Sequence, residues 1–348
     1  MYSFIDVNKK RIISQSQKPL IIAEIGINHF GSLKIAKKLV IKAKNSGAEA
    51  VKVQIHIADE EMSEESKKIS PGNSNLSIYD VIKNNSLSLK DEILLRKFIK
   101  EKNLIYIATP FSYKAVDFLK KNPADIVKIG SGECNNQPLI NYICSLNKPV
   151  ILSTGMNTVE SIKSSIKILE KNKIKYILLY CVNLYPTPLH LIRLNAINQY
   201  KKYFKKAIAI GYSDHTEGIE TAAIALSLGA KIIEKHFVLS KKDKGPDVKC
   251  SMDPEELKKL LLISNNLNNL VNKPKKNNKE EEVTKNFAFH SVVAKKNIYP
   301  GELLGFDNLT TKRPATGDFS ANDIYRLINK KVKKKIKKNF QIKKRYLK

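Results

Sequence analysis

Apolar residues in this chain gather into short, continuous runs that recur between residues 20 and 236. Each run is rich in Ile, Leu, Val and Ala and lacks polar alternation, which is typical of parallel strands buried on both faces. We therefore expect eight parallel strands, at residues 20–25, 50–55, 104–109, 125–130, 149–154, 176–181, 207–212 and 231–236.

Segments with helical periodicity separate these runs. Residues 32–47 begin with a Ser cap and end at Gly47, a residue type that commonly terminates helices. Residues 157–172, which begin at Asn157, and residues 216–229, which end at a glycine, have the same helical spacing. Strands that alternate with helices in this way indicate βαβ units. Eight such units predict an α/β fold that closes into a (βα)8 TIM barrel.

The pattern changes after the barrel. We expect an N-terminal extension over residues 1–16, the barrel over 17–271, a charged, Asn-rich linker over 272–286 and a small domain over 287–348. A domain of this size has a marginal core when alone, so we expect it to dock on another surface. Within the barrel, the polar stretch 56–88 is either a loop that covers the substrate or a flexible insertion.

The composition is strongly basic, with 62 Lys and Arg against 33 Asp and Glu and a net charge of +29. A basic chain can bind nucleic acid, but these lysines are spread along the whole sequence and no motif with interleaved aromatic residues accompanies them. Lys-rich solvated faces account for the charge, and the positive field favours the entry of an anionic substrate. We predict no nucleic-acid partner.

The cysteines and the N-terminus bear on location. The chain has only four Cys, without CxxC spacing, which argues against a disulfide framework and fits a reducing cytosol. Residues 1–10 are polar and resemble no signal peptide, and no apolar run is long enough to span a membrane. We expect a cytoplasmic protein without a membrane partner.

Two histidines end consecutive predicted strands, His215 in YSDHT and His236 in EKHF. A single His is more often a buried structural group than a ligand. Neighbouring strands lie about 4.8 Å apart, so both imidazoles could reach one ion. Two His ligands leave coordination positions open, as Lewis-acid catalysis requires.

A second group of residues suits an anion. Lys128 lies inside an apolar run, where an unpaired lysine is almost never found. Small hydroxyl residues end this strand and others, namely Thr109, Ser131, Ser153 and Ser213. Each hydroxyl alone could simply terminate a strand in a turn. Together with the lysine they indicate a phosphate site.

Carboxylates form the third group. Glu24 lies within an apolar strand, Glu133 follows Ser131-Gly132, and Asp247 lies in a GPD sequence. A buried carboxylate needs a partner, and sugar hydroxyls, water, Lys52 or a metal shell could supply one. We assign Glu234, next to His236, to an internal ion pair with Lys or Arg.

The ordered segments resemble those of the bacterial sialic acid synthase (N-acetylneuraminate synthase) family over residues 17–345. The matching segments are IAEIGINHFG, KVQ, ATPFS, KIGSGECNN, ILSTGMN, NLYPTP, GYSDHT, GAKIIEKHF, GPDVKCSMDP, FAFHSVVAKKNI and KRPATGDFS. The resemblance implies a TIM barrel followed by an antifreeze-like (SAF) domain. It also implies a domain-swapped homodimer, in which the small domain of one chain covers the barrel mouth of the other.

The family's reaction, as the resemblance implies, condenses phosphoenolpyruvate with N-acetylmannosamine and water and releases phosphate. It requires a divalent ion, typically manganese, with magnesium and cobalt as alternatives. By resemblance, the metal ligands are His215 and His236. The phosphoenolpyruvate site comprises Thr109, Lys128, Ser131, Ser153, Asn183 and Ser213, and the sugar site comprises Glu24, Lys52, Gln54, Tyr185 and Asp247, with Phe111 as a further substrate-binding residue. Arg313 would reach the N-acetyl group from the partner subunit.

The resemblance also implies a mechanism, in which the metal polarises the sugar aldehyde and carbon 3 of phosphoenolpyruvate attacks it. Glu133 would stabilise positive charge at carbon 2, with Glu24 and Asp247 as further catalytic residues. The KIGSGECNN and GPDVKCSMDP segments favour N-acetylneuraminate as the product, although Val248 departs from the GPDH of many relatives. Two alternatives stay open: a synthase of a related nonulosonic acid such as legionaminic acid, and a non-catalytic polyanion-binding protein.

Overall fold

The computed structural model describes residues 4–7, 9, 11–72 and 74–348. The chain divides into two compact units, Met1–Asn272 and Lys273–Lys348. Each unit has its own apolar core. No helix among the described residues combines the length and the apolar character that crossing a membrane requires. The four cysteines are free and buried.

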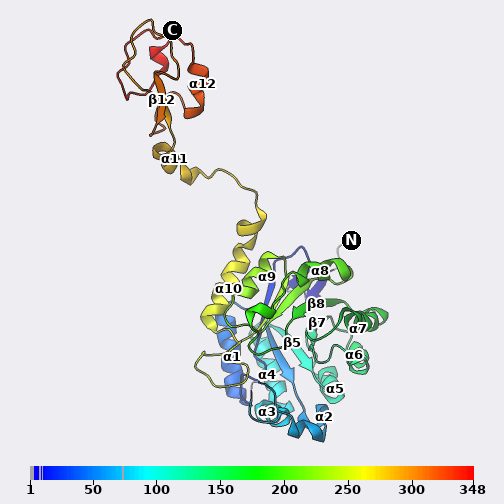
Figure 1. The fold of residues 1–348 in the computed structure, drawn as a ribbon. Helices are drawn as coiled ribbons and strands as arrows, with labels where there is room; N and C mark the ends of the chain where they lie inside the picture. The colour runs from blue at the N-terminus through cyan, green and yellow to red at the C-terminus, as the bar shows by residue number, and fades with distance from the viewer. Residues whose placement is uncertain (1–3, 8, 10, 73) are drawn as a thin grey trace. The chain divides into compact units, whose positions relative to one another are not determined.

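Eight parallel strands close into a barrel in the first unit, which confirms the predicted fold (Figure 1). Each strand pairs with the next along the chain, and the last pairs with the first. The strands are β3 (Leu20–Glu24), β4 (Ala50–Ile55), β5 (Ile105–Pro110), β6 (Ile126–Ile129), β7 (Val150–Ser153), β8 (Tyr176–Cys181), β9 (Ile210–Asp214) and β10 (Ile232–His236).

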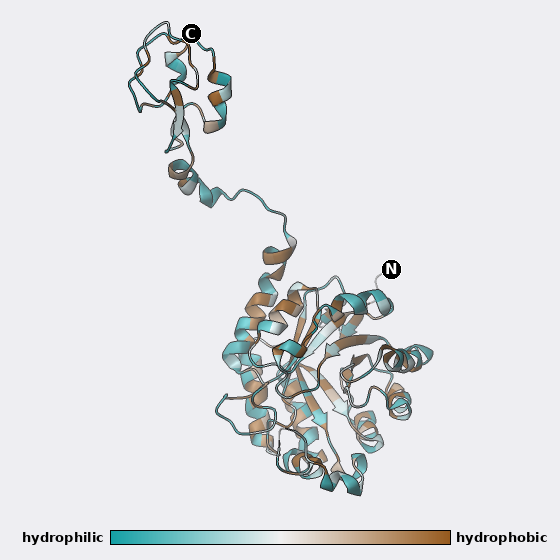
Figure 2. Ribbon diagram, viewed as in Figure 1, coloured by the Kyte–Doolittle hydropathy of each residue, from teal (hydrophilic) through white to brown (hydrophobic). Residues whose placement is uncertain are grey.

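Helices cover the outside of the barrel. They are α1 (Leu33–Asn45), α4 (Leu89–Glu101), α5 (Tyr113–Lys121), α6 (Gln137–Cys144), α7 (Val159–Lys171), α8 (Ala196–Tyr203), α9 (Glu220–Ser227) and α10 (Pro254–Leu267). Hydrophilic and hydrophobic residues alternate along them, as Figure 2 shows for α10, because one face packs on the strands.

The helix ends are set by side-chain caps. The predicted Ser cap of α1 is confirmed, because Ser32 accepts a hydrogen bond from the backbone N–H of Ile35. The expected Asn start of α7 is wrong. Thr158 caps that helix, and the side chain of Asn157 instead donates to the carbonyl oxygen of Ser131 at 2.9 Å.

A hairpin closes the end of the barrel where the strands begin. Strands β1 (Ile5–Val7) and β2 (Arg11–Ile13) pair antiparallel within the segment expected only as an extension. The side chains of Ile5, Val7 and Ile13 are buried in a cluster with inward residues from the first half of the barrel strands, among them Leu20 and Ile232. The interior at this end is therefore solid and apolar.

The segment between β4 and α4 has regular structure. It contains α2 (Ala58–Glu61), the 3₁₀ helix η1 (Glu64–Lys68) and α3 (Ile78–Asn85). Val81 and Ile82 of α3 pack with Ile27 in a small apolar cluster of their own. Regular structure and apolar packing thus occur in this segment, for which composition predicted either a covering loop or a flexible insertion.

The second unit is small and built around short strands. Strands β11 (Ser291–Ala294) and β12 (Leu309–Lys312) pair antiparallel, and α12 (Ile324–Leu327) packs on them. The unit also contains the short helical turns η4 (Lys279–Glu281), η5 (Ala321–Asp323) and η6 (Lys344–Tyr346), whereas η2 (Leu189–Leu191) and η3 (Asn268–Asn272) belong to the first unit. Helix α11 (Glu282–Ala288) begins within the range for which composition predicts a linker.

Candidate active site

A cavity of about 130 Å³ lies at the end of the barrel where the strands finish. Inward residues near the carboxyl ends of the strands form most of it, as expected for a TIM barrel. The predicted residues in its lining are Lys52, Gln54, Thr109, Phe111, Lys128, Ser131, Ser153, Asn183, Tyr185, Ser213, His215 and His236. The sequence therefore predicted most of this surface.

Two lysines and two glutamates meet in this cavity or directly behind it. The Nζ atoms of Lys128 and Lys52 lie 3.5 Å and 3.8 Å from Oε1 of Glu234. Lys52 also pairs with Glu24 and donates a hydrogen bond to Oγ1 of Thr109 at 3.3 Å. All four charged side chains are buried. The internal ion pair expected for Glu234 is confirmed, with both lysines as partners.

The pKa values of this group follow from burial and from the neighbouring charges. Burial raises the pKa of Glu234, but Lys128 and Lys52 outweigh it and hold the pKa below its ordinary value. Burial raises the pKa of Glu24 to about 7, against the attraction of Lys52. Burial lowers the pKa of Lys128. One carboxylate thus stays ionised between two lysines, and an anion entering the cavity can pair with both ammonium groups.

Small groups line the cavity beside Lys128. Oγ of Ser153 is buried without a hydrogen-bond partner among the described residues. The backbone N–H of Gly155 donates to Oγ of Ser131 at 3.0 Å. A Cβ on Gly155 would lie 2.2 Å from Oδ1 of Asn183, so only glycine lets these groups converge. An unpaired hydroxyl and further small polar groups beside a lysine suit the oxygens of a phosphate or carboxylate.

The two histidines lie side by side, with ring centroids 5.5 Å apart. His215 directly follows β9, and His236 is the last residue of β10. Tyr185 packs against both rings, with its centroid 4.2 Å from that of His215 and 5.8 Å from that of His236.

Both imidazoles are held in the neutral form, in which a ring nitrogen has a lone pair available for a metal ion. Nδ1 of His215 donates to the carbonyl oxygen of Val182 at 2.9 Å, which leaves its Nε2 free of that proton. Burial lowers the pKa of His215 to about 4. Burial and the neighbouring His215 also lower the pKa of His236 well below its ordinary value. Neutral imidazole is the form that binds metal ions.

The residues present fit an open metal site. Nδ1 of His236 is buried and lacks a hydrogen-bond partner among the described residues, although Oδ2 of Asp247 lies 3.5 Å away. Leaving a buried imidazole nitrogen unpaired is costly, and a ligand would remove that cost. Within the described part of the chain, no three His, Cys, Asp or Glu side chains are grouped to hold a metal. An ion here would complete its shell with water or substrate.

The three predicted catalytic carboxylates lie next to lining residues and not among them: Glu24 pairs with Lys52, Asp247 lies 3.5 Å from His236, and Glu133 follows Gly132. Burial raises the pKa of Asp247, next to His236, to about 6. Glu133 is half-buried, follows the lining residue Gly132 and accepts a hydrogen bond from Nδ2 of Asn136 at 3.1 Å. Burial also raises its pKa. Arg313 is exposed on the second unit.

Several residues of this site were not among the predicted lining residues. Glu234 and Cys181 line the cavity. Both could have been found from the sequence, because side chains two residues apart on a strand point to the same face. Glu234 lies two residues before the predicted ligand His236, and Cys181 lies two residues after the inward Leu179. His56 stacks on Phe111, with centroids 4.2 Å apart, and one of its ring nitrogens lies 3.0 Å from Oε1 of Gln54. Its other ring nitrogen lies 2.9 Å from Oε1 of Glu61 on α2, a contact that no local pattern predicts.

Comparisons with known proteins agree with this architecture. The NeuB family model matches residues 39–276, and the SAF domain model matches residues 289–344. An N,N'-diacetyllegionaminic acid synthase of Campylobacter jejuni is 40% identical, covering 86% of this chain and 92% of its own length. The human N-acetylneuraminate-9-phosphate synthase is 31% identical, covering 90% of this chain and 88% of its own.

A solved structure extends the comparison to three dimensions. The N-acetylneuraminic acid synthetase of Leptospira borgpetersenii superposes with a TM-score of 0.72 at 30% identity. The superposition covers 82% of this chain and 95% of that one.

Proposed function

Because this chain belongs to the NeuB family and ends in a SAF domain, we propose that it condenses phosphoenolpyruvate with N-acetylmannosamine and water, giving N-acetylneuraminate and phosphate. The observation that carries the proposal is the cavity itself. It combines two buried lysines and several small hydroxyls, of which that of Ser153 is unpaired, on one side with two neutral imidazoles on the other. An anion site beside an open metal site is what joining an enol phosphate to an aldehyde requires.

Phosphoenolpyruvate would occupy the lysine side of the cavity. Its phosphate and carboxylate are anions that can pair with Lys128 and Lys52, and the hydroxyls of Ser131, Ser153 and Ser213 would donate to their oxygens. Glu234 lies between the lysines and keeps both side chains aimed into the cavity before the substrate arrives. Such preorganisation lowers the ordering cost of binding.

His215 and His236 would hold a divalent cation, of which manganese is our first choice. When bound, the cation supplies Lewis-acid polarisation of the sugar's aldehyde oxygen. The chain's part is to present two neutral nitrogens. Tyr185 fixes the faces of both rings by packing.

In the chemical step, carbon 3 of phosphoenolpyruvate forms a bond to the aldehyde carbon of the open-chain sugar. Water then adds to carbon 2, and the tetrahedral adduct expels phosphate and leaves the ketone. Glu133, at the rim, would stabilise positive charge at carbon 2. Glu24 and Asp247 have pKa values raised by burial to about 7 and about 6, so either can exchange a proton near neutral pH.

The sugar assignment depends on the KIGSGECNN and GPDVKCSMDP segments and on the likeness to the Leptospira synthetase. A second candidate product is N,N'-diacetyllegionaminic acid, which the 40% identity to the Campylobacter jejuni synthase favours. We also propose a domain-swapped homodimer in the cytoplasm, in which Arg313 of the partner subunit would contact the N-acetyl group.

The test is phosphate release from phosphoenolpyruvate with a panel of sugars and metals. We expect turnover with N-acetylmannosamine and manganese, and none in chelator. Turnover only with the 2,4-diacetamido-trideoxy analogue would replace the first product by the second. No turnover with either sugar, together with steeply salt-dependent binding of a polyanion, would instead support the non-catalytic alternative.

A further inference from the structure

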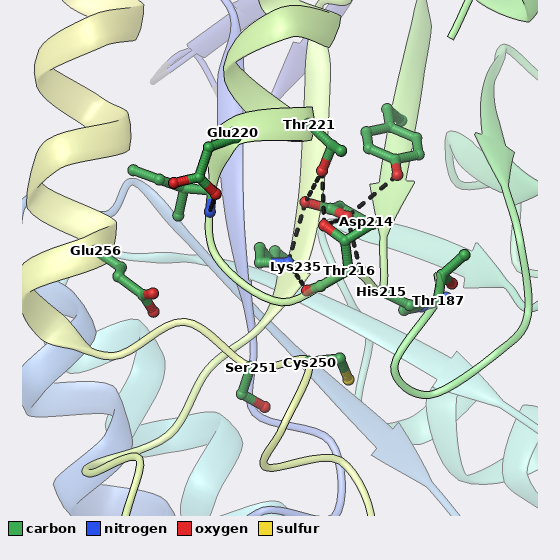
Figure 3. Close-up of polar contacts among 12 residues, drawn as sticks. Thr187, Asp214, His215, Thr216, Glu220, Thr221, Lys235, Cys250, Ser251 and Glu256 are labelled. Carbon is green, nitrogen blue, oxygen red and sulfur yellow. Dashed lines mark hydrogen bonds and ion pairs between the residues drawn. The ribbon is translucent and has the colours of Figure 1, made fainter. Parts of the chain in front are cut away.

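A buried polar network lies behind the two histidine-bearing strands, on the side that faces the helices (Figure 3). Asp214 ends β9 and Lys235 is the penultimate residue of β10, and both side chains have no exposed surface. The outward positions below them on the same strands, Ile210, Tyr212 and Ile233, belong to the apolar core. An ion pair therefore occupies a layer that is otherwise apolar here.

The network satisfies both charges. Nζ of Lys235 lies 3.0 Å from Oδ2 of Asp214 and donates to the carbonyl oxygen of Thr216 at 2.7 Å. Oδ1 of Asp214 accepts from the backbone N–H of Thr216 at 2.9 Å and from its hydroxyl at 2.8 Å. Further hydroxyl groups donate to the same carboxylate, from Thr221 on α9 at 3.0 Å and from Tyr212 at 3.1 Å.

Stability alone does not explain such a pair. Taking two charges out of water costs several kcal/mol for each ion, and replacing a buried ion pair by apolar residues of similar volume is often neutral or stabilising. Directional bonds from Lys235 and Asp214 do, however, restrict the backbone in a way that apolar contacts cannot.

The restricted backbone carries the imidazoles. Asp214 and Thr216 flank His215, and the network holds the N–H and the carbonyl group of Thr216. His215 is held independently at its own carbonyl oxygen, which accepts from the backbone N–H of Thr187 at 2.8 Å. Lys235 directly precedes His236 and pairs in register with Asp214.

We propose that Asp214 and Lys235 are positioning residues that fix the separation of His215 and His236 and thereby set the affinity of the site for a divalent cation. The proposal rests on the metal site of the proposed function. A site with only two protein nitrogens has no third side chain to restore its geometry when one ligand moves. Groups that orient metal ligands from behind typically contribute about 10- to 100-fold in affinity.

The experiment measures the binding of manganese alone to the full chain, by the loss of the free-ion electron paramagnetic resonance signal. We expect Lys235→Met to weaken binding about 10-fold or more, and Thr221→Val, which removes one donor to Asp214, to weaken it by less. The double variant Asp214→Leu with Lys235→Met removes both charges. It leaves the donors of Thr216, Thr221 and Tyr212 without this acceptor, so it should melt several degrees below the unmodified protein, and in the folded state it should bind manganese at least about 10-fold more weakly.

Two controls separate positioning from general damage. Tyr200→Phe breaks a comparable buried contact behind β7, where the hydroxyl oxygens of Thr154 and Tyr200 lie 2.9 Å apart, and it should leave manganese affinity unchanged. Calorimetric binding of phosphoenolpyruvate without metal should weaken less than manganese binding in every variant, since Ser213 and Glu234 adjoin the network but Lys52 and Lys128 lie on other strands.

A folded double variant with unchanged manganese affinity would overturn the proposal. So would a double variant that cannot fold, because the pair would then be structural. Failure of the unmodified protein to bind manganese would instead remove the metal from the proposed function. The phosphate-release assay reports on that function separately.

Discussion

The two ends of the barrel are made by the same eight strands and have opposite interiors. Where the strands begin, inward residues such as Leu20, Ile107 and Ile232 pack with the β1–β2 hairpin into a solid apolar cluster. Where the strands finish, the inward residues two or four positions further along are Glu24, Thr109 and, on β10, Glu234 with His236. The polar end encloses a cavity, and the apolar end does not take part in it.

The inward-facing residues therefore serve folding at one end of the barrel and chemistry at the other. Burying apolar surface contributes roughly 25 cal/mol per Å², so the closed end stabilises the barrel. Burying Lys52, Lys128 and Glu234 costs free energy unless each charge is paired, so the open end is retained for what it binds. On β9 a Cβ at Gly211 would lie 2.6 Å from Cδ2 of Leu179, which shows how closely the interior is filled below the cavity.

The largest effect should come from removing a proposed metal ligand, and this effect should be confined to the open end of the barrel. We expect His215→Ala to lower kcat/KM by about 10³-fold or more at any manganese concentration, because the polarisation of the aldehyde is lost. Initial rates of phosphate release over a range of substrate concentrations, with and without chelator, measure it. The control is His190→Ala, an exposed histidine. Full turnover of His215→Ala in chelator would contradict the metal assignment.

Much of this comparison could be predicted from the sequence. The apolar runs predict the strands, and the polar residues at their ends predict the cavity, because parallel strands bring their carboxyl ends to one face. Lys128 stood out because a buried lysine needs a partner, and that partner is Glu234. The family match confirms the resemblance to the sialic acid synthases.

Other features could not be predicted, for physical reasons. Strands β1 and β2 have three residues each, too short for periodicity to register, and their stability comes from contacts with residues far along the chain. The contact of His56 with Glu61 depends on where the short helix α2 lies. The Asp214–Lys235 pair requires knowing that both side chains face the helices, whereas their neighbours His215 and His236 line the cavity.

Mutations at the closed end should change stability and leave catalysis intact. Ile13→Ala deletes a buried side chain of the hairpin and should lower the free energy of unfolding by about 3 kcal/mol. Urea unfolding measures this, and kcat/KM below the transition should match the unmodified protein. Ile12→Ala, on the exposed face of the same strand, should cost much less. A large loss of kcat/KM in folded Ile13→Ala would show that the two ends are coupled.

The smallest expected effect is a difference in how the two ends respond to pH. Burial raises the pKa of Glu24 from 4.5 to about 7, so between these values the native state binds a proton that the unfolded chain has released. The contribution of Glu24 to the free energy of unfolding therefore slopes downward as pH rises through this window, by roughly 1 to 2 kcal/mol between pH 5.5 and 7. Glu24→Gln should flatten this slope, as urea unfolding across the window would show. Ile13→Ala at the closed end and Glu101→Gln at an exposed carboxylate should give curves parallel to that of the unmodified protein, because neither removes a buried ionisable group. An unchanged slope in Glu24→Gln would mean that Lys52 keeps this carboxylate ionised in the native state, and the proton exchange near neutral pH would then fall to Asp247.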